Sequence, residues 1–109
     1  MNNEVFQKII AKRIGAVMTT LTSKGDEYTV GLDRLSNFKE AAALLGRTEE
    51  QVLLGYVTKH IVALKDFIQD GKTVSQAQWV EKFQDIICYM LILETLLIEN
   101  ERFNEDSNV

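Results

Sequence analysis

The spacing of apolar residues predicts a helix over the first part of the chain. Between Asn3 and Leu21 the large apolar side chains recur every three or four residues, as on one face of an amphipathic helix; they are Phe6, Ile9, Ile10, Ile14, Val17 and Leu21. The next stretch, Thr22 to Leu32, contains the polar cluster Ser23–Asp26 and two glycines. Such residues favour turns, so an irregular loop is expected there.

A shorter apolar stripe predicts a second helix from Asp33 to Leu45. Asp33 is a suitable N-cap, because its carboxylate can accept hydrogen bonds from the free N–H groups at the start of a helix. Gly46 follows the stripe and can adopt the left-handed conformation that often ends a helix.

A capping box predicts the start of the third helix. Thr48 is followed three residues later by Gln51, so each side chain can bond the backbone N–H of the other. The helix is expected to run to about Gln69, before an Asp-Gly pair. Its expected core face consists of Leu53, Val57, Ile61, Leu64 and Ile68.

The fourth helix is expected to begin with a second capping box, formed by Ser75 and Gln78, and to continue to about Arg102. From Ile86 to Ile98 it is apolar on nearly every side. A helix of this kind must be covered on more than one side. The rest of a small chain can hardly do this, so a homodimer or higher homo-oligomer is expected.

These segments together predict an all-α fold, a four-helix bundle with two long antiparallel helices and two shorter ones. Residues 1–103 are expected to form a single helical domain, and residues 104–109 a flexible acidic tail. The chain of 109 residues contains no proline, which agrees with long helices joined by short turns.

The net charge limits the kinds of partner that we expect, and the cysteine content indicates the cellular compartment. With 12 basic and 16 acidic residues the net charge is −4, so direct DNA binding and attachment to an anionic membrane are not expected. The single cysteine, Cys88, cannot form an intrachain disulfide. With no signal-peptide pattern at Met1, a cytoplasmic location is expected. The longest apolar run, Ile86–Leu93, is too short to cross a membrane.

Two groups of polar residues are candidates for chemistry on the long helices. Glu81 and Asp85 are four residues apart, so both carboxylates lie on one face and could share Mg²⁺ or Mn²⁺. Lys59, His60 and Asp66 lie on the preceding helix and could approach that pair across an antiparallel contact. A solvated face with Lys82 as a neighbour, and a histidine packed near the core, are the structural alternatives.

A third group lies at the expected start of the second helix. Arg34 and Lys39 could hold a phosphate there, and Asn37 could contact a base or sugar. A capped surface helix with solvated charges explains the same residues equally well. Nucleotide-binding glycine motifs and zinc-protease motifs are absent from the sequence.

The order of several short motifs resembles that of a known family. The motifs are Lys24-Gly-Asp-Glu-Tyr28, Asp33-Arg-Leu-Ser-Asn-Phe38, Lys59-His60 with Asp66, and Glu81-Lys82 with Asp85 and Tyr89. In this order they resemble the small phage and prophage MazG-like proteins, a nucleotide-modification-associated group near the all-α nucleotide pyrophosphohydrolase superfamily. The resemblance spans roughly Lys24 to Leu97.

The resemblance implies a helical bundle that forms dimers or dimers of dimers and hydrolyses a nucleoside triphosphate to a monophosphate and pyrophosphate with Mg²⁺. By position, the implied metal ligands and catalytic residues are Glu81, Asp85 and Asp66. The implied contacts with the nucleotide are Lys59, His60, Arg34, Asn37, Tyr28 and Lys24. If the chain is phage-encoded, the implied location is the host cytoplasm.

The chain departs from the superfamily pattern of an ExxE pair on the earlier helix and ExxD on the later one. It has Lys59-His60 and Asp66 instead of the first pair, and the second pair, Glu81 and Asp85, is one residue wider. Two functions therefore stay open. One is a metal-dependent nucleotide-binding protein with or without hydrolase activity, and the other is a non-enzymatic accessory protein that inhibits a host defence protein through an acidic surface.

Overall fold

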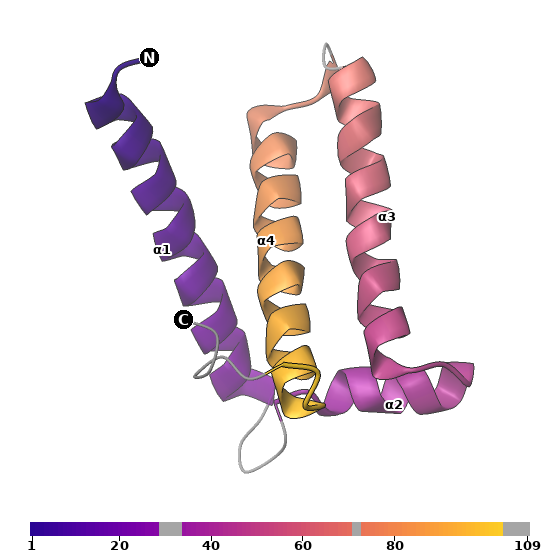
Figure 1. Cartoon of the computed structure of the whole chain (residues 1–109). Coiled ribbons are helices and arrows are strands. Elements are labelled where there is room, and N and C mark those ends of the chain that lie inside the picture. The colour runs from indigo at the N-terminus through magenta and orange to yellow at the C-terminus, as the bar shows by residue number, and fades with distance from the viewer. Residues whose placement is uncertain (29–33, 71–72, 104–109) are drawn as a thin grey trace. The chain divides into compact units, whose positions relative to one another are not determined.

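A computed structural model describes the backbone of residues 1–28, 34–70 and 73–103, and the side chains of these residues except 24–28. It contains four helices, α1 (Asn3–Tyr28), α2 (Ser36–Leu45), α3 (Glu49–Gln69) and α4 (Gln76–Glu99), and no strand within the described ranges (Figure 1). The predicted all-α class is therefore confirmed. The chain divides into two compact units, Met1–Arg34 and Leu35–Val109, which are described separately.

The first unit consists of α1, which is longer than the sequence pattern predicts. The expected loop from Thr22 is wrong as far as Tyr28, because the helix continues through Ser23–Asp26. A glycine or serine inside a helix costs only about 0.5–1 kcal/mol relative to alanine, which a continuous helix can absorb. The Thr22 hydroxyl also donates to the Met18 carbonyl at 2.8 Å, so this polar side chain bonds within the helix.

The second helix begins later than expected. Its first residue is Ser36, and Leu35 occupies the N-cap position without a side-chain cap bond. Leu35 is buried in the core of the second unit, so packing sets this helix start. Asp33, the expected cap, lies outside the described residues. At the other end Gly46 has φ +64° and its N–H bonds Ala42 and Ala43, which confirms the predicted glycine stop.

Both predicted capping boxes are present. The Thr48 hydroxyl accepts from the Gln51 N–H at 3.1 Å, and the Gln51 side chain accepts from the Thr48 N–H at 3.0 Å. Ser75 and Gln78 form the same reciprocal pair at 3.2 and 2.9 Å. The fourth helix ends at Glu99, three residues before the expected end.

Helices α3 and α4 form an antiparallel hairpin, and α2 lies across the end where α3 begins and α4 ends (Figure 1). The buried core at this end consists of Leu35 at the N-cap of α2, Leu53 of α3 and Leu96 of α4. Phe38, Tyr89, Ile92 and Leu93 pack around these three residues. The core is therefore concentrated at the α2 end of the hairpin.

The expected core face of α3 is covered over only part of its length. Leu53 and Val57 are buried and Leu64 is half-buried, whereas Ile61 and Ile68 are exposed. The prediction that the whole stripe is buried is therefore wrong for the single chain. None of the described helices is long and apolar enough to cross a membrane.

Candidate functional site

A cluster of polar side chains joins the middle of α3 to α4. His60 projects from α3, and its Nδ1 lies 3.2 Å from Nζ of Lys82 and 3.7 Å from Oδ2 of Asp85. The His60 and Asp85 side chains retain 16% and 32% of their exposure, so the cluster is half-buried but reachable from solvent. Antiparallel packing of the two helices brings these groups together.

Aromatic rings extend this cluster toward α2. The His60 ring stacks on Tyr89 with centroids 5.3 Å apart and an angle of 20°. Tyr89 contacts Tyr56 at 5.6 Å, and Tyr56 meets Phe38 edge-on at 6.1 Å. Such ring pairs add about 0.5–1.5 kcal/mol each beyond their buried area. We call His60, Lys82, Asp85 and Tyr89 the His60 cluster, since the rings hold the imidazole in place beside the two charged groups.

The environment of Tyr89 disfavours its ionised form. Burial raises the pKa of its hydroxyl above the ordinary value of 10.0, and the neighbouring Asp85 carboxylate raises it further, followed by Tyr56 and Cys88. Desolvation and nearby negative charge both oppose formation of a phenolate. Tyr89 is therefore a neutral packing residue over the physiological pH range.

This pKa shift predicts a loss of stability in alkaline solution. The folded state holds the Tyr89 proton more tightly than the unfolded state does. The resulting contribution to the free energy of unfolding is fully present below pH 10 and is lost as the pH rises through the pKa of the folded state. Urea unfolding measured from pH 8 to 11 should show this fall in the wild type. The free energy of unfolding should fall less over this pH range in Tyr89→Phe than in Tyr56→Phe. Equal falls in the two variants would contradict the assignment of the effect to Tyr89.

The other long-helix candidates lie outside direct contact with the His60 cluster. Lys59, Asp66 and Glu81 are all exposed. Successive helix residues point about 100° apart, so Lys59 faces away from the direction that His60 takes. The described residues contain no group of three or more histidine, cysteine or acidic side chains placed to hold a metal ion. The three candidate carboxylates thus do not form a complete resident metal site.

The structure describes the side chains of two of the four remaining candidates, Arg34 and Asn37. Arg34 belongs to the first unit, where its Nη2 donates to the Leu21 carbonyl at 2.8 Å. Asn37 is exposed on α2. The side chains of Lys24 and Tyr28 lie outside the described residues, so their expected contacts with a nucleotide stay predictions.

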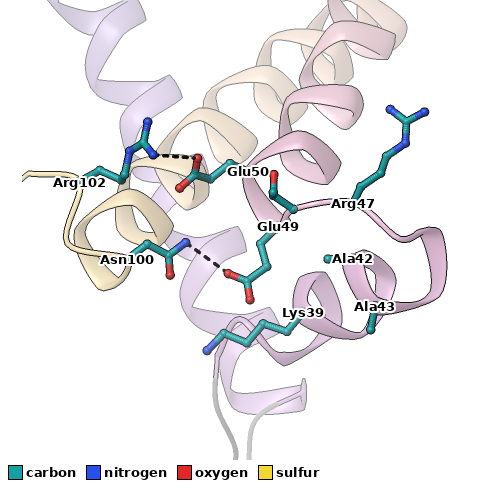
Figure 2. A pocket seen from close by; sticks show the side chains of 9 residues that line it. Lys39, Ala42, Ala43, Arg47, Glu49, Glu50, Asn100 and Arg102 are labelled. Carbon is teal, nitrogen blue, oxygen red and sulfur yellow. Dashed lines mark hydrogen bonds and ion pairs between the residues drawn. The ribbon is translucent and has the colours of Figure 1, made fainter.

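A separate cavity of about 520 Å³ lies where α3 begins, and Lys39 is the one candidate residue from the sequence that lines it. Glu49 accepts from Asn100 at 3.3 Å, Arg102 lies 4.0 Å from Glu50, and Arg47 points away from both carboxylates (Figure 2). Lys39 forms an ion pair with Glu99 at the same end of the hairpin. These contacts link the end of α4 to α2, and the residues that follow α4 to α3, which gives the cavity walls a structural role.

Sequence reasoning missed the part that Lys82 plays in the His60 cluster and the ring contact of Tyr56 with Tyr89. Lys82 figured only as a charged neighbour of the acidic pair, and Tyr89 only as part of a motif. Lys82, Asp85 and Tyr89 are spaced by three and four residues, which places them on one face of α4. Tyr56 and His60 have the same relation on α3. That spacing was the available signal.

Comparisons with models of known protein families, with curated proteins and with solved structures found no match. The functional interpretation therefore depends on the His60 cluster itself.

Proposed function

We propose that the protein binds a nucleoside triphosphate through its phosphates at the His60 cluster. The observation that supports this best is the half-buried Lys82 ammonium beside the His60 ring on a solvent-reachable surface. Lysine carries three N–H donors, so Lys82 can bond His60 and still offer two donors to phosphate oxygens. The exposed Lys59, next in sequence to His60, adds a second positive charge on the same helix.

A divalent ion enters this proposal with the nucleotide. Mg²⁺ commonly keeps several waters and binds one or two protein carboxylates together with substrate phosphates. Asp85 and Glu81 are the carboxylates that would hold Mg²⁺ or Mn²⁺, with Asp66 as a further candidate on α3. An ion that is bound jointly with phosphate needs no complete set of protein ligands.

Hydrolysis to a monophosphate and pyrophosphate is the catalytic form of the same proposal, as in the MazG-like proteins that the sequence resembles. Its test is pyrophosphate release from a panel of deoxynucleoside triphosphates with Mn²⁺. If the wild type neither binds nor cleaves any triphosphate, the nucleotide proposal is wrong and the accessory-protein function becomes the better interpretation.

The phosphate contact predicts a strong effect of Lys82→Gln on binding. Loss of a charge-assisted hydrogen bond should weaken triphosphate affinity by about 1.5–3 kcal/mol, roughly 10- to 150-fold. Titration calorimetry on the wild type and the variant would measure this change. Lys65→Gln is the matched control, because Lys65 is exposed on α3. Equal losses in both variants would point to general charge attraction instead of a site.

We also propose that a second copy of the chain covers the exposed apolar stripe on α4. Phe83, Ile87, Met90 and Leu91 are exposed there, and an adjacent groove of about 340 Å³ is lined by residues including Leu97 and Phe103. From Phe83 to Leu97 the helix extends over about 21 Å. An apolar stripe of this length, interrupted by Glu94 in the groove lining, suits a two-fold interface, the commonest arrangement among soluble oligomers.

A further inference from the structure

The two ring nitrogens of His60 have different surroundings. Nδ1 lies beside Lys82 and Asp85, at 3.2 and 3.7 Å. Within the described part of the chain, Nε2 forms no hydrogen bond, and no side-chain nitrogen or oxygen there is both buried and unpartnered. The Nε2 atom of this half-buried ring therefore reaches solvent.

The contact with Lys82 determines where the proton of a neutral ring must be. A lysine ammonium has donors but no acceptor, so Nδ1 has to accept in this contact. An accepting Nδ1 leaves the proton on Nε2. The Asp85 oxygen is too distant for a hydrogen bond, but it is the nearest alternative partner for Nδ1.

We propose that Lys82 holds neutral His60 in the tautomer with its proton on Nε2, so that the ring offers an N–H donor to a phosphate oxygen. The inference rests on the proposed nucleotide binding and assigns a second task to Lys82, that of a positioning residue. Neutral imidazole then contributes to anion binding without taking up a proton. In this tautomer Nε2 has no lone pair for general-base chemistry.

The chain contains one histidine, so nitrogen NMR reports this tautomer without ambiguity. In ¹⁵N-labelled wild type at pH 8.5, Nε2 should give the shift of a protonated ring nitrogen and Nδ1 that of an unprotonated one. In Lys82→Met, Asp85 becomes the nearest polar partner and the predominant tautomer should change to Nδ1–H. Lys82→Arg should restore the wild-type pattern, and Lys65→Met should leave it unchanged.

Inorganic pyrophosphate distinguishes a failure of this inference from a failure of the proposed function. Binding should shift the Nε2 signal of the wild type, and Lys82→Met should reduce pyrophosphate affinity at least about tenfold. Two outcomes would overturn this inference while leaving the phosphate site in place. In both, pyrophosphate binds, but either the wild type has the Nδ1–H tautomer or Lys82→Met does not change the tautomer. The expected tautomer with no pyrophosphate response would overturn both the donor role and the phosphate site.

Discussion

Replacing Leu53 with alanine is expected to lower the free energy of unfolding by about 2–5 kcal/mol. Leu53 has no exposed surface and packs with Leu35 and Leu96 where α2, α3 and α4 meet. Removing three carbons there loses apolar burial and leaves a cavity that three helices can close only in part. For a domain of this size the change is a large fraction of the total stability.

Leu54→Ala is the matched control, because the next residue on the same helix is 55% exposed. It carries the same change in composition and helix propensity, but it should alter the unfolding free energy by only about 0.5 kcal/mol. Chemical denaturation of both variants would measure the difference. Similar losses in the two would show that the Leu35–Leu53–Leu96 core does not dominate the stability of this unit.

Met90→Asp is expected to convert the proposed homo-oligomer into monomers. Met90 is 48% exposed on α4, so an aspartate there is tolerated in a single chain but would become an unpaired charge in an apolar interface. Light scattering after gel filtration should give a mass of at least twice 12.4 kDa, the mass of one chain, for the wild type. The variant should have a mass of 12.4 kDa. Leu93 is less suitable, since it packs against the monomer core.

Leu44→Asp serves as the control for surface charge, because Leu44 is exposed on α2, away from the α4 stripe. It should leave the oligomer intact. A wild type that is monomeric at micromolar concentration would contradict the proposed interface. Dissociation by Leu44→Asp would instead place the contact on α2.

Local rules predicted the helix starts at Thr48 and Ser75 to the residue, because a capping box is complete within four residues. The same rules failed at Tyr28 and Ser36, where continuity of a long helix and burial of Leu35 outweigh turn and cap preferences. Periodicity identified the apolar face of α3, but not which neighbour covers it. Ile61 and Ile68 have the spacing of core residues, but they are exposed in the structure.

For the candidate site, the antiparallel hairpin was the part that the sequence could predict, and it brings His60 to Asp85. Which lysine contacts this pair depends on the rotation of each helix about its axis. One residue along a helix changes direction by about 100°, so Lys59 and Lys82 could not be distinguished from spacing alone. The contact itself selects Lys82.

The turn end of the hairpin carries Trp79, the single tryptophan of the chain, between Phe67 of α3 at 5.6 Å and Phe83 at 6.2 Å. Its fluorescence therefore reports closure of the turn end, while the part of the near-ultraviolet absorbance change that is lost in Tyr89→Phe reports the middle of the same hairpin. Coincident unfolding curves from the two signals would indicate a cooperative transition. A tryptophan signal that changes first would mean that the hairpin opens from its turn, with the leucine core separating last.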